Sequence, residues 1–209
     1  MRRFQMITEA DARVLELGST VVLVAGGLIT PLAQDTLRAR RVSVIAEGAA
    51  GDAASLTPAA DVRTIAIAGD HTSLQMKKAI VAHLRGGGRA VHDLGTTTSD
   101  PVDYPDTAAA AARAVARGEA DAGVVIDGAG LGSAIAANKI PGVRAAMCLN
   151  ETLARYARQH NGANVLTLGS TILTTEQALA IVDVFVGTPM HEARYIRRLA
   201  KIRELESRP

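Results

Sequence analysis

The chain has 209 residues, of which 48% are apolar, so it can form one medium-sized domain with a sizeable core and a small appendage. Its formal net charge is +2 and no apolar run approaches the roughly 18 residues of a membrane span, so we expect neither a nucleic-acid nor a membrane partner. The single cysteine, Cys148, excludes an intrachain disulfide, and the N-terminus lacks the apolar run of a secretory signal, so we expect a cytoplasmic protein.

Residues 1–50 are predicted to form a small appendage, a helix followed by a βαβ unit. Helical spacing covers residues 7–17 and 30–41, and strand-like apolar runs cover 19–26 and 42–47. Two such short strands bury little surface, so we expect the appendage to pack against another part of the chain or against a partner.

A linker is predicted at residues 51–62. The stretch "GAAGDAASLTPAAD", from Gly48 to Asp61, is rich in alanine and glycine, as expected where few contacts cross a domain boundary. Residues 63–209 then form the larger domain, and all the candidate site residues described below lie in it.

Apolar runs and helical patterns alternate through the larger domain. The predicted strands are 64–69, 89–95, 122–127, 142–148 and 164–169. The predicted helices are 73–85, 104–118, one from the glycine-rich turn to about Asn138, 150–160, 174–187 and 190–207. This alternation is typical of right-handed βαβ units, and it predicts an α/β fold with a parallel sheet and helices on both faces. Such sheets bind ligands at the carboxyl ends of their strands.

The first predicted strand of this domain ends at "AGDH", which places Asp70 and His71 at the carboxyl edge of the sheet. One interpretation is structural, a helix-capping aspartate beside a surface histidine. The other is a polar pair that contacts the hydroxyls or the phosphate of a sugar.

The third predicted strand ends on a carboxylate, Asp127, and continues as "GAGLGS". Gly128, Gly130 and Gly132 allow unusual backbone dihedrals, and amides that enter a helix favour negative charge. The spacing is GxGxG rather than the GxGxxG of dinucleotide-binding turns. The turn therefore either stabilises charge that develops on a small substrate or is a tight connection without a ligand.

Two further pairs could take part in chemistry. "RQHNGANV" places His160 and Asn161 in a predicted loop before the fifth strand, where the histidine could donate a proton. Arg194 and Arg198 are four residues apart on the last helix, so they form either a solvated face or a phosphate clamp.

These motifs together resemble one family. "GDH", "VDYPD", "GAGLGSAIAANKIPGVRAA", "ARQHNGANVLTLG" and the R-x-x-x-R helix, within residues 64–202, are similar to ribose-5-phosphate isomerase B and the galactose-6-phosphate isomerase subunits. The resemblance implies a Rossmann-like five-stranded parallel sheet and an aldose–ketose isomerase that needs no metal or cofactor. It also implies a homodimer or a dimer of dimers whose active sites are shared between subunits.

The resemblance implies a role for each matching position. Asp70 and His71 would contact the sugar phosphate, and Tyr104 would line the pocket. The glycine-rich turn would bind the substrate and hold its enediolate through Gly128, Ala129, Gly130, Leu131, Gly132 and Ser133.

The same resemblance assigns the residues at the C-terminal end of the match. His160 would reach into the site of the neighbouring subunit and open the furanose ring, with Asn161 beside it. Arg194 and Arg198 would bind the phosphate.

The chain departs from the family at four positions. Asp127 stands where many members carry the cysteine that moves a proton between C1 and C2, and Ser133 where another branch carries a glutamate. Ala129 replaces a small hydroxyl residue, and Thr171 replaces an arginine. Carboxylates also act as enolising bases, so we expect Asp127 to be the base.

Three functions stay open. The first is an isomerase of a phosphorylated pentose, which the retained site residues favour. The second is a non-catalytic sugar-phosphate binder or partner subunit. The third is an interaction protein, in which the appendage docks to a shell or an enzyme and the isomerase-like domain is only a scaffold. Its basis is that "ITEAD", "GSTVVL" and "GLITPLAQDTLRAR", within residues 1–50, resemble N-terminal segments of enzymes associated with bacterial microcompartments. The protein would then work in or beside such a microcompartment.

Overall fold

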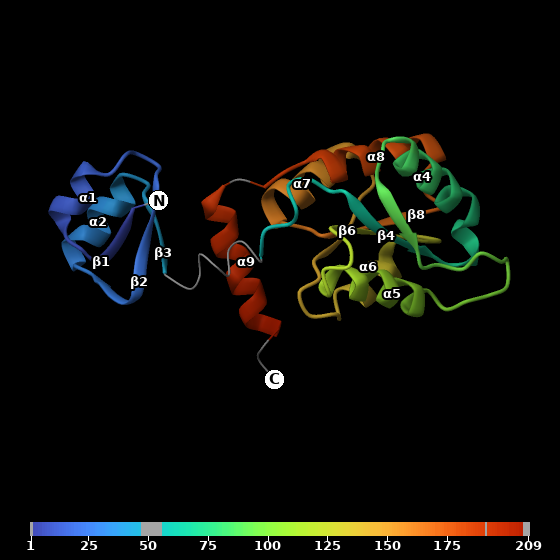
Figure 1. The fold of residues 1–209 in the computed structure, drawn as a ribbon, viewed down its shortest axis with the longest axis horizontal. Helices are drawn as coiled ribbons and strands as arrows, with labels where there is room; N and C mark the ends of the chain where they lie inside the picture. The colour runs from blue at the N-terminus through green and yellow to red at the C-terminus, as the bar shows by residue number, and fades with distance from the viewer. Residues whose placement is uncertain (1, 47–55, 191, 207–209) are drawn as a thin grey trace. The chain divides into compact units, whose positions relative to one another are not determined.

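The computed structural model describes residues 2–46, 56–190 and 192–206, and the chain forms two compact units (Figure 1). The first unit comprises Met1–Thr57 with Glu192–Pro209, and the second comprises Pro58–His191. This division differs from the predicted one, which kept residues 192–209 with the larger domain. Positions 51–55 of the predicted linker lie outside the described residues.

The second unit is built on a five-stranded sheet in the order β5-β4-β6-β8-β7, with every pair parallel. Its strands are β4 (Thr64–Gly69), β5 (Ala90–Asp93), β6 (Ala122–Asp127), β7 (Ala145–Met147) and β8 (Val165–Gly169). The predicted α/β fold with a five-stranded parallel sheet is therefore confirmed.

Helices cover both faces of this sheet (Figure 1). One face carries α4 (Leu74–Gly86), α7 (Glu151–Asn161) and α8 (Thr175–Gly187), and the other carries α5 (Tyr104–Ala116) and α6 (Leu131–Ala137). A single 3-10 turn, η1 (His71–Ser73), joins β4 to α4.

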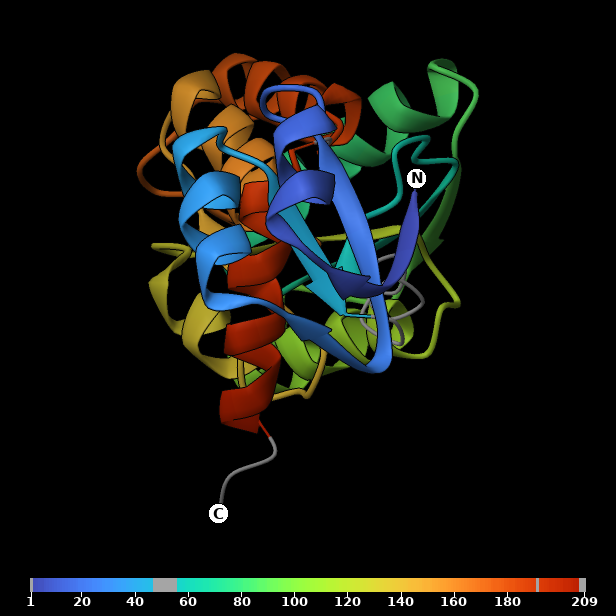
Figure 2. The same cartoon turned by 90° about the vertical axis from the view of Figure 1, so that its left-hand side faces the viewer.

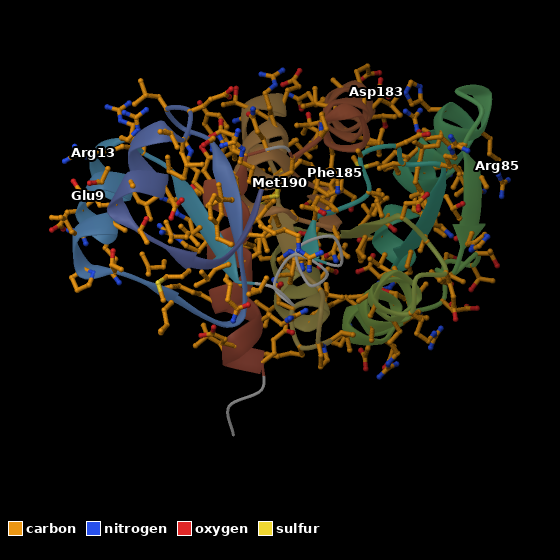
Figure 3. All side chains as sticks on the ribbon, turned by 60° about the vertical axis from the view of Figure 1, so that its left-hand side comes forward. Glu9, Arg13, Arg85, Asp183, Phe185 and Met190 are labelled. Carbon is orange, nitrogen blue, oxygen red and sulfur yellow. The ribbon has the colours of Figure 1, made fainter. Side chains whose placement is uncertain are left out.

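The two faces of the sheet have different cores because side chains alternate along each strand. Ile65 and Ile67 of β4 pack with large residues of α4 and α8 and with alanines of α7, whereas Ala66 and Ala68 pack with alanines of α5. Small residues on both sides bring α5 close to the sheet. On the other face, Nε2 of His83 in α4 lies 2.7 Å from Oδ1 of Asp183 in α8, and Figure 3 labels Asp183.

The first unit has its own three-stranded parallel sheet, in the order β1-β2-β3. Its elements are β1 (Arg3–Ile7), α1 (Glu9–Val14), β2 (Thr20–Ile29), α2 (Pro31–Ala39), β3 (Ser43–Ala46) and the C-terminal α9 (Ala193–Glu206), which contacts β3. Two successive right-handed crossovers place α1 and α2 on the same face of the sheet (Figures 1 and 2).

The predicted helix over residues 7–17 is wrong at its start. Thr8 caps α1 in a capping box with Asp11, so the helix begins at Glu9. The preceding residues pair with β2, with Arg3 opposite Val22. The unit is therefore βαβαβ rather than helix–βαβ. The exposed side of α1 carries an ion pair between Arg13 and Glu9 at 2.6 Å (Figure 3).

Candidate active site

Three neighbouring strands end together at the carboxyl edge of the five-stranded sheet. In the ladder, Gly69 of β4 lies opposite Ile126, and Asp127 of β6 lies opposite Gly169 of β8. The segments that follow these strands carry most of the candidate residues. The structure thus brings Asp70, Asp127 and the glycine-rich turn to one edge, where ligands of parallel sheets bind.

Asp127 is buried, with 4% of its surface exposed, and both of its carboxylate oxygens accept hydrogen bonds. Oδ1 accepts from the amide of Gly130. Oδ2 accepts from the amide of Ser133 at 2.9 Å and from its hydroxyl at 2.7 Å. Both oxygens are therefore engaged by groups of the turn that follows β6.

Asp127 also organises the turn that follows it. Gly130 is the N-cap residue of α6 and has no side chain, so Asp127 supplies the acceptor that a capping residue usually supplies. Gly130 has φ +79°, and a Cβ there would lie 2.9 Å from the carbonyl carbon of Leu168, so both dihedral and space require glycine. Its carbonyl accepts from the Thr167 hydroxyl at 2.7 Å.

Part of the predicted amide site is already in use. The Gly130 amide donates to Asp127 and so is not open to a substrate in this structure. Leu131 and Gly132 occupy the first two positions of α6, where backbone amides have no partner within the helix. The amides at these two positions remain the best placed donors for a substrate oxygen.

Asp70 and His71 lie at the same edge, immediately after β4. The Oδ1 atom of Asp70 accepts from the amide and the hydroxyl of Thr72, at 2.9 and 2.6 Å. Nδ1 of His71 accepts from the amide of Val102 at 3.3 Å, which leaves Nε2 as the protonated nitrogen of the neutral ring. His71 can therefore donate one hydrogen bond to a ligand.

Tyr104 begins α5 beside the glycine-rich turn. A Cβ on Gly132 would lie 2.6 Å from two carbons of the Tyr104 ring, so the ring rests directly on the turn. The side chain is 42% exposed. This position suits the predicted role in lining a pocket.

Sequence reasoning missed two hydroxyl residues at this edge. Thr72 follows β4 and Ser170 follows β8, and their side-chain oxygens are 3.3 Å apart. The Ser170 hydroxyl also donates to the carbonyl of Asp127 at 3.0 Å. The signal available in the sequence was their position, since each follows a predicted strand within three residues.

His160 and Asn161 lie elsewhere. The helix predicted over residues 150–160 already included His160, but the assignment of both residues to a loop was wrong. They are the last two residues of α7, whose C-cap is Gly162 in the left-handed conformation. The helix runs from the carboxyl edge back towards the start of β8, so these residues lie at the amino edge, opposite to Asp127. The ring of His160 stacks on Tyr156, with centroids 4.6 Å apart.

Arg194 and Arg198 lie on α9, in the first unit. Both guanidinium groups stack on the ring of Tyr195, at 4.7 and 5.5 Å from its centroid. Arg194 is also paired with Glu192 at 2.5 Å. Both arginines thus stack on the same aromatic side chain.

Cys148 and Lys77 are buried ionisable side chains in the second unit. Burial raises the pKa of Cys148 to about 11, so this thiol is protonated at neutral pH and is no substitute for a catalytic cysteine. Lys77, which is 2% exposed, donates to Asp93 at 2.5 Å.

The described residues offer neither a metal site nor a membrane-spanning helix. No group of three or more histidine, cysteine, aspartate or glutamate side chains there could hold a metal ion. None of the helices in this part of the chain is both long and apolar enough to cross a membrane.

The sequence matches the family described as Ribose/Galactose Isomerase over residues 65–202. Ribose-5-phosphate isomerase B of Escherichia coli K12 is 42% identical over 147 residues, which cover 70% of this chain and 99% of that protein. Ribose-5-phosphate isomerase B of Mycolicibacterium paratuberculosis is 40% identical over 139 residues, which cover 66% and 87% respectively.

Solved structures of ribose-5-phosphate isomerase B are also similar to this chain. Ribose-5-phosphate isomerase B of Clostridium thermocellum has 44% identity and a TM-score of 0.67, and the match covers 68% of this chain and 97% of that chain. The enzyme of Mycoplasma genitalium, solved with bound ribulose-5-phosphate, has 40% identity and a TM-score of 0.67, with 70% and 97% covered.

Proposed function

Because the chain belongs to the ribose/galactose isomerase family, we propose that it interconverts an aldose and a ketose phosphate of a five-carbon sugar, ribose 5-phosphate and ribulose 5-phosphate. Membership of the family makes the chain an isomerase, as its sequence predicts. The choice of sugar is supported by the relatives described above, whose names give ribose 5-phosphate as the substrate.

The observation that carries the proposal is the position of Asp127. It ends the central strand β6 at the ligand-binding edge, and it stands at the position of the family's usual cysteine base. In the proposed reaction the C2–H bond breaks, its electron pair forms the C1–C2 double bond of an enediolate, and Asp127 takes the proton. The proton then returns to C1, while a hydroxyl proton moves from the C2 oxygen to the C1 oxygen.

Charge balance supports a carboxylate in this role. Asp127 loses its negative charge at the moment when the enediolate gains one, so the total charge of the buried site stays constant. The amides of Leu131 and Gly132 would then donate to the enediolate oxygen. Asp70, His71 and Tyr104 would orient the sugar beside the turn.

Phosphate binding favours cationic side chains. Lys77, which lies near this edge, is committed to Asp93, and Thr171 stands where relatives carry an arginine. We therefore retain Arg194 and Arg198 as the phosphate ligands. A pair of guanidinium groups on one helix suits a dianion.

A homodimer is supported by the position of His160. This residue and Asn161 lie at the edge opposite to Asp127, so in one copy they cannot serve the same substrate. In a dimer the His160 of one copy would open the sugar ring bound by the other. Exposed apolar side chains on α6 and α7 supply an interface, namely Leu131, Ile135, Leu153 and Tyr156.

Residues 1–57 of the first unit lie outside the family match, which begins at residue 65. For this unit we propose docking to a bacterial microcompartment, on the strength of the sequence resemblance, with the enzyme working in the cytoplasm in or beside the shell. A shell-docking unit would leave catalysis to the second unit and α9.

A non-catalytic role is the second candidate, because the hydrogen bonds of Asp127 would also suit a purely structural residue. The purified protein would be assayed against a panel of aldose and ketose phosphates, with deuterium incorporation from solvent at C2 as the readout. We expect isomerisation and exchange in the wild type and a loss of at least about a hundredfold in Asp127→Asn, which keeps the shape and removes the base.

Asp103→Asn is the matched control, since Asp103 is exposed and makes no capping hydrogen bond. Full turnover and exchange in Asp127→Asn would remove Asp127 from the mechanism. Sugar-phosphate binding without turnover in the wild type would support the non-catalytic candidate instead.

A further inference from the structure

The hydroxyl of Ser133 is directed at Asp127 and not at solvent. Ser133 has no exposed surface, and its Oγ lies 2.7 Å from Oδ2 of Asp127. Its amide donates to the same oxygen at 2.9 Å. The residue therefore cannot touch a substrate in this structure, although the sequence placed it among the substrate-binding residues.

The two carboxylate oxygens of Asp127 accept different numbers of hydrogen bonds. Each carboxylate oxygen offers two lone pairs. Oδ2 accepts two hydrogen bonds, both from Ser133, and is saturated. Oδ1 accepts one, from Gly130, and keeps one lone pair. Among the described residues, no other group donates to this carboxylate.

We propose that Ser133 is a positioning residue that fixes Asp127 so that Oδ1 is the atom that transfers the proton. The inference rests on the proposed function, in which Asp127 is the base. It explains how an aspartate, whose side chain has two equivalent oxygens, can present a single basic atom to the substrate.

The arrangement is compatible with both protonation states. When Oδ1 takes the proton from C2, Oδ2 becomes the carbonyl oxygen of the acid and can still accept both hydrogen bonds from Ser133. The side chain then need not rotate between taking the proton and returning it to C1. A base fixed in this way loses little conformational entropy in the transition state, whereas a mobile side chain would first have to be ordered.

The test compares Ser133→Ala with the wild type. Loss of a hydrogen bond to a charged group weakens the ionised form, so the acid limb of the kcat/KM profile should move up by about one pH unit. We expect kcat to fall about tenfold or more while KM stays within about twofold, because Ser133 makes no substrate contact. Ser133→Thr, which restores a hydroxyl, should return the acid limb towards its wild-type position.

Thr167→Val is the matched control. It removes another buried hydroxyl from the same turn, the one bonded to the carbonyl of Gly130, and leaves all three donors to Asp127 in place. Its acid limb should stay where the wild type has it. If Ser133→Ala does not fold, as judged by circular dichroism, Ser133→Cys replaces it, because a thiol of similar size is a weak donor.

A second readout separates this inference from the proposed function. The carboxyl carbon of Asp127, identified by its absence in Asp127→Asn, can be titrated by NMR without any turnover. A midpoint that rises by about one pH unit in the Ser133 variant supports positioning even if the wild type proves inactive. A midpoint and an acid limb that both stay unchanged would overturn the inference, and so would a variant in which only KM changes.

Discussion

Cys148 shows how burial alone can exclude a residue from chemistry. It is the only cysteine of the chain, and 1% of its surface is exposed. Burial raises its pKa to about 11 from an ordinary value of 9.0. The protein therefore has no reactive thiol in its native state, unlike relatives with a cysteine base.

We predict that iodoacetamide leaves the activity of the native protein unchanged at pH 7.5 and alkylates Cys148 only after unfolding in urea. The stability linked to this group is fully present below pH 9 and is lost as the pH rises towards 11, because folding favours the thiol over the thiolate. Mass spectrometry of the alkylated protein, with Cys148→Ala as the control, measures the reaction. Rapid inactivation of the native protein would show that the thiol is accessible.

The sequence predicts which residues follow the strands but not what their side chains touch. The position of Asp127 after an apolar run was enough to place it at the sheet edge. Its bonds to Gly130 and Ser133 depend on the left-handed dihedral of Gly130, which no spacing rule gives. The burial of Ser133 therefore came only from the structure.

The side chain of Arg158, in α7, joins three segments of the second unit through hydrogen bonds to their backbone carbonyls. Although fully buried, it donates to the carbonyl oxygens of Ala59 at 2.7 Å, Ala163 at 3.0 Å and Thr188 at 3.3 Å. Its guanidinium also lies 5.2 Å from the ring centroid of Phe185 (Figure 3). Burial lowers the pKa of Arg158 to about 10.

We predict that Arg158→Met lowers the free energy of unfolding by about 3 kcal/mol, because it leaves three carbonyl groups without their donor. Arg155→Met, an exposed site on the same helix, should change it by less than about 0.5 kcal/mol. Urea unfolding followed by circular dichroism measures both. Equal stabilities for the two variants would show that water or rearrangement replaces the lost donors.

The elements themselves were predicted unevenly, for a physical reason. The strands of the larger sheet are buried on both faces, so they appear as continuous apolar runs such as "TIAIAG" and "AGVVID". Strand β1 reads "RFQMI", with Arg3 and Gln5 exposed, and its apolar signal is too weak to separate it from α1. The capping pair Thr8 and Asp11 was the missed boundary signal.

For the whole molecule, the question is how far the first unit and the isomerase depend on each other. Each unit has its own core, one centred on Ile7 and Leu37 and the others on the larger sheet. The Escherichia coli relative is covered over 99% of its length by a match that leaves about a third of this chain unmatched. Almost the whole of that relative is therefore matched without residues 1–57, which precede the family match.

The position of α9 makes this dependence testable. The family match extends through α9 to residue 202, yet the helix groups with the first unit and contacts β3. If Arg194 and Arg198 bind phosphate, α9 serves the isomerase even though it packs with the appendage. Removing residues 1–57 and removing α9 should then have different effects.

We predict that residues 58–209 fold and isomerise within about fivefold of the full chain, a change of about 1 kcal/mol in transition-state stabilisation. This truncation begins at Pro58, so it keeps the Ala59 carbonyl that Arg158 needs. Residues 58–191 should fold equally well but lose activity on phosphorylated sugars, because both arginines are gone. Steady-state kinetics measures the activity, circular dichroism the folding and sedimentation the oligomeric state. We expect both truncations to stay dimeric, because the exposed residues of α6 and α7 are kept. A folded, dimeric but inactive 58–209 chain would mean that the first unit holds α9 in its working position, and the two units would then form one catalytic body.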